Sequence, residues 1–143
     1  MKTTARNQFP GIITAIDFGP VTTQVNVSLA AGHEVTATLT TNAARRLDAA
    51  IGKAALVLIK SSAVVLVTDF EGYALSARNQ LAGKVAHIER GAVSSLIGLT
   101  LAGGALITAS VTNDAVDALG LQLGQAATAV FKAYSVMLAV KSV

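Results

Sequence analysis

The strongest constraint in this sequence is an internal duplication, which appears when the chain is shifted by 72 residues against itself. Without any gap, 22 of the 71 aligned pairs are identical. The longest shared run is Ala-Arg-Asn-Gln, at residues 5–8 and 77–80. Chance does not hold one register over such a span, so we predict two homologous modules, residues 3–71 and 75–143. The joint at residues 70–74 is too short to let the modules drift apart.

Each module has the pattern of a small set of β-strands with one helix. Apolar and polar residues alternate from Val21 to Leu29, which is the period of a half-buried strand. A Thr-Asn start followed by Ala and Arg predicts a helix over residues 41–50. In the second module residues 112–114 cap a short helix that Gly120 ends. The other strands are expected at residues 11–17 (after a turn at Pro10-Gly11), 34–40, 54–60, 63–68, 93–101 and 106–111.

The order of these elements indicates the fold class. Three strands, a helix and two more strands in a module of this length are typical of an OB-like barrel. We therefore expect a mainly β chain of two tandem OB-like five-stranded barrels, each with one short helix. An open α+β sheet is the alternative.

Composition limits the classes of function. The chain has 143 residues, no cysteine, 52% hydrophobic and 13% charged residues, and a net charge of +3. Disulfide scaffolds and Cys-ligated metal sites are excluded. No apolar run approaches the ~18 residues that span a bilayer, and the first residues lack the apolar core of a secretory signal. We expect a cytoplasmic protein without a membrane partner. So little charge on a short chain favours a homo-oligomer over a monomer with an Ala- and Val-rich surface.

Three polar groups recur in both modules and consist mainly of hydrogen-bond donors. Residues 4–8 and 76–80 bring a hydroxyl, a guanidinium and two amides. Residues 39–43 and 111–115 place hydroxyls and backbone N–H groups at a helix start, and residues 59–62 and 131–134 end an apolar strand with one Lys. Such a donor-rich set suits a fully ionised tetrahedral dianion better than monohydrogen phosphate, whose O–H needs an acceptor. Asp114 is the one opposing charge.

Each group also has a purely structural interpretation. The repeated Arg-Asn-Gln is equally consistent with a clasp between modules. Thr40 and Thr112 are also expected as ordinary helix N-caps, and Lys60 and Lys132 as strand-end side chains that reach into solvent. The two histidines do not align between the modules, and the carboxylates are scattered without an acid–base pair.

Residues 76–140 resemble the Mop domain of the molbindin family. The resemblance is carried by the opening SARNQLxGxV, by the VT before the short helix and by the ending KAxxVMLA. Residues 3–68 match less strictly, since Thr4 stands in place of Ser76 and Ser61-Ser62 in place of Ala133-Tyr134. Two such Mop/TOBE-type domains in tandem are similar to the di-Mop molbindins.

The resemblance implies intracellular binding, storage and homeostasis of molybdate and tungstate, without catalysis or a cofactor. Molybdenum is then bound as an oxyanion between subunits and not as a bare cation. It also implies a homotrimer with hexamer-like pseudo-symmetry, sites of unequal affinity in the two modules, and further sites near a threefold axis. The implied binding residues are Thr4, Ala5, Arg6, Asn7, Thr40, Ala43, Lys60, Ser61, Ser76, Ala77, Arg78, Asn79, Thr112, Ala115, Lys132 and Ala133.

Two other classes of function stay open on the sequence. An OB-type single-stranded nucleic-acid binder is compatible with the positive charge, but only six aromatic residues and one basic pair, Arg45-Arg46, are present. An enzyme acting on a small anion lacks an evident base, nucleophile or metal cluster. No helix-turn-helix region or phosphate-binding loop accompanies the modules, so we expect free-standing storage without nucleic-acid binding.

Overall fold

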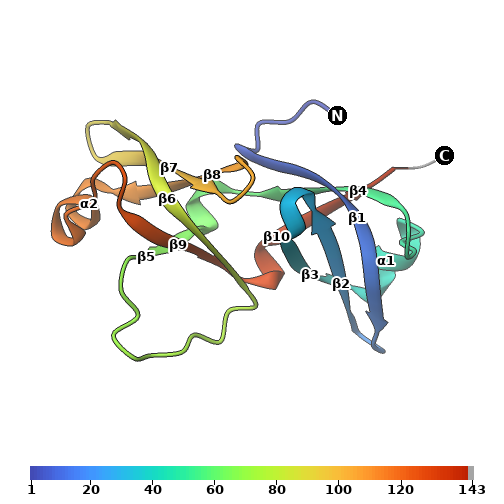
Figure 1. Ribbon diagram of the computed structural model, residues 1–143. Helices are drawn as coiled ribbons and strands as arrows, with labels where there is room; N and C mark the ends of the chain where they lie inside the picture. Colours follow the sequence, from blue (N-terminus) through green and yellow to red (C-terminus); the bar gives the residue numbers. More distant parts are fainter. Residues whose placement is uncertain (142–143) are drawn as a thin grey trace. The chain divides into compact units, whose positions relative to one another are not determined.

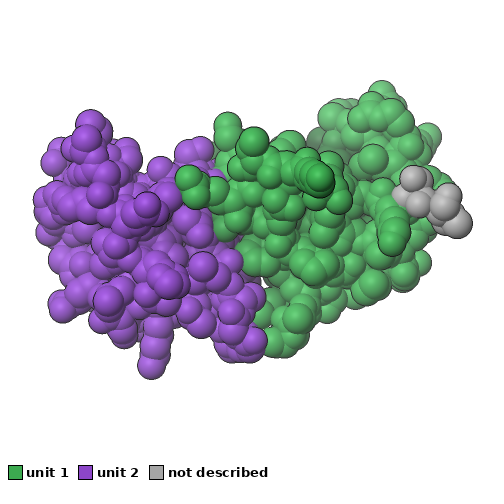
Figure 2. Space-filling model, turned by 90° about the horizontal axis from the view of Figure 1, so that it is seen from above, with its two compact units in different colours: residues 1–60, 132–143 green, residues 61–131 purple. Residues whose placement is uncertain are grey.

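The computed structural model describes residues 1–141; residues 142 and 143, which end the second predicted module, lie outside the described residues. The chain forms two compact units, residues 1–60 with 132–143 (unit 1) and residues 61–131 (unit 2), coloured separately in Figure 2. Each unit contains a five-stranded antiparallel sheet and one short α-helix (Figure 1). The predicted mainly β fold of two OB-like barrels is therefore confirmed.

Unit 1 is a sheet with the strand order β10-β4-β1-β2-β3. Its edge strands β10 and β3 contact each other, which curls the sheet towards a barrel. The first 3-10 turn η1 links β2 to β3, and η3 leads into β10. The elements are β1 (Asn7–Phe18), β2 (Thr22–Leu29), η1 (Ala30–Gly32), β3 (Glu34–Thr40), α1 (Thr41–Arg46), β4 (Ala54–Ile59), η3 (Ala133–Ser135) and β10 (Val136–Val140).

Unit 2 repeats this architecture with the order β5-β9-β6-β7-β8. Its edge strands β5 and β8 again contact each other, and the turn η2 leads into β5. The elements are η2 (Ser61–Ala63), β5 (Val65–Val67), β6 (Asn79–Arg90), β7 (Ser94–Leu101), β8 (Leu106–Thr112), α2 (Asn113–Leu119) and β9 (Ala126–Phe131).

The compact units differ from the sequence repeats because the last strand of each repeat is exchanged. β5 belongs to the first repeat by sequence but pairs with β9, and β10 belongs to the second repeat but pairs with β4 (Figure 1). The chain therefore passes from unit 1 to unit 2 after Lys60 and returns after Phe131. The segment 70–74, which is predicted to join the two sequence modules, lies within unit 2.

The alternating pattern predicted for residues 21–29 is found in β2, with one exception. Thr23, Val25 and Val27 are almost fully buried, as the period of two requires. Val21 precedes the strand in the turn after β1 and is 73% exposed. Its counterpart in the second repeat, Val93, is 75% exposed.

The first strand begins earlier than predicted, because Pro10 and Gly11 lie inside β1 and do not form a turn. The ladder between β1 and β2 begins only at Gly11, so Pro10 lies where β1 has a strand partner on one side only. At Gly11 the strands approach closely, and a Cβ there would lie 2.6 Å from the carbonyl O of Ser28. Gly83 meets Thr100 in the same way in unit 2, also at 2.6 Å.

The first helix is shorter than predicted and the second agrees with the prediction. α1 ends at Arg46 and not at residue 50, because Asp48 takes the left-handed conformation with φ 54°. Lys53 Nζ then holds the Asp48 carbonyl O at 2.8 Å. α2 is capped by Thr112 and ends at left-handed Gly120, as expected. No helix within residues 1–141 has the length and hydropathy that crossing a membrane requires.

Candidate functional site

The first polar group forms a short turn at the start of β1 in unit 1 and of β6 in unit 2. The Gln8 side-chain amide donates to the carbonyl O of Ala5 at 3.0 Å, and Gln80 donates to Ala77 at the same distance. The residues that begin the two groups, Thr4 and Ser76, are exposed. The glutamines therefore have a structural role, because they fix the backbone that presents the hydroxyl and the guanidinium.

The two asparagines of this group are buried, unlike their neighbours. Asn7 is 1% exposed and Asn79 is 2% exposed, and each has an interaction partner within the chain. The preceding residues, Arg6 and Arg78, are exposed. The arginine side chains are therefore the more accessible hydrogen-bond donors of the group, whereas the asparagines are buried at the start of β1 and β6.

Each arginine and the lysine of the third group flank the end of the same strand ladder. Asn7 and Ile59 form the last pair between β1 and β4, and Arg6 and Lys60 are their neighbours in the chain. Asn79 and Phe131 form the last pair between β6 and β9, with Arg78 and Lys132 as their neighbours. All four cations are exposed. Each repeat thus holds an exposed arginine and an exposed lysine, the cation pair, just beyond the end of this ladder.

No described carboxylate neutralises these cations. Within residues 1–141 the ion pairs join Lys53 to Asp48 and Arg90 to Asp117, and none involves the four paired cations. The same part of the chain holds no group of His, Asp or Glu residues that could bind a metal ion. Arginine and lysine without a carboxylate partner can donate charge-assisted hydrogen bonds to an anion. These exposed cations are therefore suited to bind an anion.

The third group continues into a 3-10 turn in both repeats. Ser61 opens η2 and is half-buried, whereas Ala133 opens η3 and is 6% exposed. The turn η2 packs on β8 in unit 2, and η3 packs on β3 in unit 1. The residue after each lysine therefore lies in the unit that its exchanged strand enters.

The second polar group lies at the other end of the sheet. Thr40 pairs with Thr22, next to the turn where β1 finishes, whereas Arg6 precedes the first residue of β1. Thr40 Oγ1 accepts from the backbone N–H of Ala43 at 3.1 Å, and Thr112 Oγ1 accepts from Ala115 at 3.2 Å. The interpretation of these threonines as helix N-caps is confirmed. Within one unit, the structure does not bring this group to the cation pair.

The residues after these caps clamp the neighbouring turn. Thr41 Oγ1 donates to the carbonyl O of Gly19 at 2.7 Å and lies 2.8 Å from Thr23 Oγ1. In unit 2, Asn113 Nδ2 donates to Gly91 O at 2.9 Å, and its Oδ1 accepts from Ser95 at 2.6 Å. These side chains are committed to structure and are not available to a ligand.

The two helices carry opposite charges, and at one equivalent position the sign is reversed, from Arg45 to Asp117. α1 includes Arg45 and Arg46, whereas α2 includes Asp114 and Asp117. Arg90 forms two hydrogen bonds with the Asp117 carboxylate, at 2.8 and 3.0 Å. The hydrogen bond from Arg90 lowers the pKa of Asp117, and the same bond raises the pKa of Arg90, which the nearby charges of Asp117 and Asp114 raise further.

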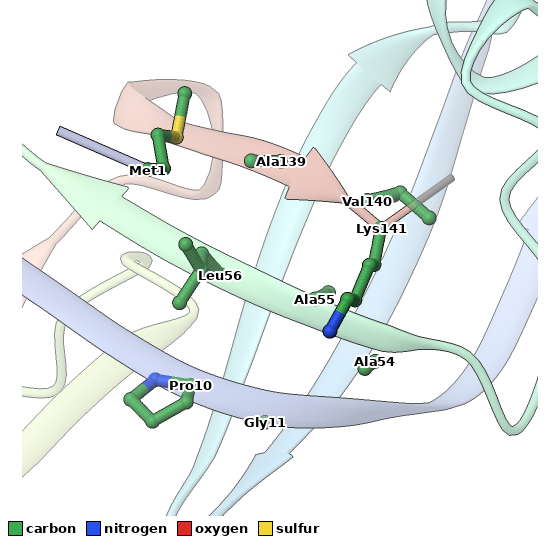
Figure 3. Close-up of a pocket in the computed structure, with 9 residues that line it drawn as sticks. All are labelled: Met1, Pro10, Gly11, Ala54, Ala55, Leu56, Ala139, Val140 and Lys141. Carbon is green, nitrogen blue, oxygen red and sulfur yellow. The ribbon is translucent and has the colours of Figure 1, made fainter. Parts of the chain in front are cut away.

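Two shallow grooves lie at matching places on the units, and sequence reasoning did not identify them. The groove of unit 1, about 560 Å³, lies over β1, β4 and β10 and is lined mainly by small apolar residues such as Gly11 and Ala55 (Figure 3). Lys141 supplies its one lining charge. Gly83 and Ala127 line the matching groove of about 320 Å³ in unit 2, with Asp69 in place of the lysine. Neither groove is lined by a predicted site residue or is rich in donors.

The fold and the duplicated cation pairs agree with the family to which the chain is assigned. The model of the TOBE domain matches residues 3–66 and residues 75–138, one match in each repeat. The chain therefore belongs to the TOBE domain family and contains two TOBE domains in tandem, as the resemblance to Mop/TOBE-type proteins predicted.

A more particular likeness is to the solved structure of the cytoplasmic molybdate-binding protein ModG with molybdate bound. The two chains are 45% identical and superpose with a TM-score of 0.96, over 99% of this chain and 100% of that one. A similarity of this extent confirms the predicted resemblance to a tandem Mop-type protein.

The curated relatives are longer proteins. The molybdenum transport protein ModE of Herbaspirillum seropedicae is 67% identical over 141 residues, which are 99% of this chain and 52% of that protein. The molybdenum-pterin-binding protein MopA of Rhodobacter capsulatus is 39% identical, over 97% of this chain and 52% of its own length. The chain thus spans about half the length of these relatives. None of these names describes an enzyme, in agreement with the predicted absence of catalysis.

Proposed function

We propose that this chain binds molybdate, and tungstate in the same manner, as an intact oxyanion and without a cofactor. The observation that carries the proposal is the duplicated cation pair at the end of a strand ladder, Arg6 with Lys60 and Arg78 with Lys132. Such cations supply both charge and N–H donors to a tetrahedral dianion. The likeness to molybdate-bound ModG supports the choice of ligand.

The proposed donors come from all three polar groups. Arginine and lysine supply the charge, and hydroxyls, amides and backbone N–H groups supply further hydrogen bonds. Such a set disfavours monohydrogen phosphate, because its O–H needs an acceptor. The proposed binding residues are Thr4, Ala5, Arg6, Asn7, Thr40, Ala43, Lys60 and Ser61, with their counterparts Ser76, Ala77, Arg78, Asn79, Thr112, Ala115, Lys132 and Ala133.

The sites require a second protomer in this proposal. Within unit 1, Thr40 and Arg6 lie at opposite ends of the sheet, so a site that contains both groups takes one of them from another unit, which we propose belongs to a neighbouring copy. Large aliphatic side chains are exposed at matching positions of the two repeats, which fits a surface that a repeated interface covers: Val21 (73%) and Val93 (75%), Ile51 (68%) and Leu123 (66%), Val65 (59%) and Met137 (54%). We propose a homotrimer with hexamer-like pseudo-symmetry.

The proposed role is storage and homeostasis of molybdate in the cytoplasm. ModG, which this chain resembles over its whole length, is a cytoplasmic molybdate-binding protein. A pair of repeats with several anion sites per chain suits reversible buffering of an anion. The prediction that the chain does not bind nucleic acid stays a prediction.

The similarity to ModE favours a second candidate, the molybdate-sensing part of a regulator. A relative from Escherichia coli (strain K12), 39% identical over 140 residues, is the DNA-binding transcriptional dual regulator ModE. Storage predicts no molybdate-dependent DNA binding by the natural protein that contains this chain. A gel-shift assay at low salt, with double- and single-stranded DNA and with or without molybdate, separates the two roles and also tests the nucleic-acid alternative.

Calorimetric titration tests the proposed ligand. We expect strong heats with molybdate and tungstate, and much weaker heats with sulfate and phosphate. Absence of molybdate binding, or equal binding of sulfate, would overturn the proposal.

Variants of the cation pairs test the proposed site. We expect Arg78→Ala to weaken one class of site by more than about tenfold while the fold is kept, because a charge-assisted hydrogen bond is lost. Lys84→Ala is the matched control, since it removes one exposed positive charge elsewhere on β6. If Arg78→Ala disrupts the oligomer without changing the affinity of the folded protein, the arginine is a structural clasp.

A further inference from the structure

The two repeats differ in charge at the residue that follows the clamping side chain. Thr40 and Thr112 cap their helices in the same way, with bonds of 3.1 and 3.2 Å. Two positions later, the first repeat has the neutral Asn42 and the second has Asp114, both exposed. This position lies between the threonine and the alanine that the proposed sites use. An otherwise conserved geometry thus carries a carboxylate in one repeat only.

The neighbouring charges reinforce this difference. Arg90 neutralises Asp117 on α2, but within residues 1–141 Asp114 forms no ion pair with any residue. In the first repeat, Arg45 of α1 stands at the position equivalent to Asp117. Phe18 of β1, which has no charge, stands at the position equivalent to Arg90. The surroundings of Thr40 therefore carry the positive charge of the α1 arginines. Near Thr112, Arg90 alone faces two carboxylates, Asp114 and Asp117, so the balance of charge there is negative.

We infer that Asn42 and Asp114 set the order of affinity of the oxyanion sites, so that sites containing the Thr40 segment fill first and sites containing the Thr112 segment fill later. The inference rests on the function proposed above and assigns the inequality of the sites to one position. It does not require either short helix to bind an anion alone, because Arg and Lys supply the attraction. Asp114 acts only by repulsion.

Electrostatics gives the size and the signature of the effect. A single charge several ångströms from a dianion in a partly hydrated surface site changes the binding constant by about tenfold. The interaction between partly exposed charges is screened within ~10 Å at 0.1 M salt. The gap in affinity between the two classes should therefore narrow as salt is added, whereas a gap caused by shape would not.

Reciprocal exchange of the two residues tests the inference in the full chain, with molybdate as the titrant at low salt. We expect Asp114→Asn to raise the molybdate affinity of the weaker class of sites about tenfold and to leave the tighter class unchanged. We expect Asn42→Asp to lower the molybdate affinity of the tighter class about tenfold. Both residues are accepted in the first turn of a helix, so the variants should fold. Asp69→Asn is the matched control, because it removes an exposed carboxylate from unit 2 outside the proposed sites.

The possible outcomes separate the inference from the proposed function. If the parent does not bind molybdate, the function fails and the inference fails with it. If the parent binds molybdate but neither exchange changes the affinity of either class of sites, only the inference is overturned. The same holds if Asp69→Asn changes the affinity equally. Opposite shifts from the two exchanges, which shrink with added salt, support it.

Discussion

At the residue scale, one structural role is filled by two different side chains. Thr41 in unit 1 and Asn113 in unit 2 each bind a glycine carbonyl in the preceding turn and a hydroxyl on the adjacent strand. Thr41 is 5% exposed, so its hydroxyl makes these hydrogen bonds in a region that excludes water. The sequence placed both residues in a donor group, but this geometry assigns them to the fold.

Removal of the Thr41 hydroxyl should therefore destabilise the protein. We expect Thr41→Val, which keeps the shape of the side chain, to lower the free energy of unfolding by about 1–3 kcal/mol, because the Gly19 carbonyl loses its partner in a buried place. Denaturant unfolding measures the change. Thr22→Val, at an exposed neighbouring position, should change stability by less than about 0.5 kcal/mol. Equal effects of the two substitutions would show that the clamp contributes nothing.

At the scale of elements, one ion pair ties the second helix to its sheet. Arg90 is the last residue of β6 and Asp117 lies within α2, so their two hydrogen bonds connect the strand to the helix. The first repeat has Phe18 and Arg45 at these positions. The two helices are therefore attached to their sheets by different chemistry, although their capping is the same.

This attachment should depend on pH. The hydrogen bond from Arg90 holds the pKa of Asp117 below its ordinary value of 3.8. A carboxyl group with a lowered pKa contributes stability above its unfolded value, and the contribution is lost as the pH falls through the folded value. We expect Asp117→Asn to lower the midpoint of thermal unfolding slightly at neutral pH, with a difference that vanishes on acidification below 3.8. Glu89→Gln, in no described ion pair, should show no such trend, and a difference that grows in acid contradicts the assignment.

Periodicity predicted the elements well where one face of a strand is buried, as in β2. It failed where a single residue overrides the pattern. Asp48 stops α1 through a left-handed conformation, which is unusual for a non-glycine residue and leaves no signal in the hydrophobic pattern. Aligned repeats identified Arg6 and Lys60, and the structure places both just beyond the last pair of the ladder between β1 and β4. The separation of Thr40 from this pair depends on tertiary structure and could not be read from spacing.

At the scale of the whole molecule, the exchange of β5 and β10 could not be predicted from the sequence, and the reason is physical. Leu66 and Leu138 occupy equivalent positions, are both buried and have the same side chain. The two strands therefore offer nearly the same apolar face to either sheet, and the alternating pattern cannot distinguish self-completion from exchange. The limits 3–71 and 75–143 remain a prediction for the duplicated sequence units.

A core substitution in an exchanged strand should reveal which unit it stabilises. We expect Leu138→Ala to cost about 2–5 kcal/mol and to raise hydrogen exchange first in β4 and β1, which share its sheet. Leu66→Ala is the matched variant and should raise exchange first in β9 and β6. Mass spectrometry of deuterated fragments reads both patterns. If Leu138→Ala loosens β9 and β6 first, the strand assignment is incorrect.

The exchanged strands also fix the sequence of events during translation. All five strands of unit 2 lie within residues 61–131, whereas unit 1 needs residues 136–140 to finish its sheet. The sheet begun first on the ribosome is therefore completed last. Until β10 emerges, the outer backbone edge of β4 stays open to other chains, and an open edge is a known route to aggregation. Slow synthesis of residues 136–140 would prolong the interval in which this edge is open.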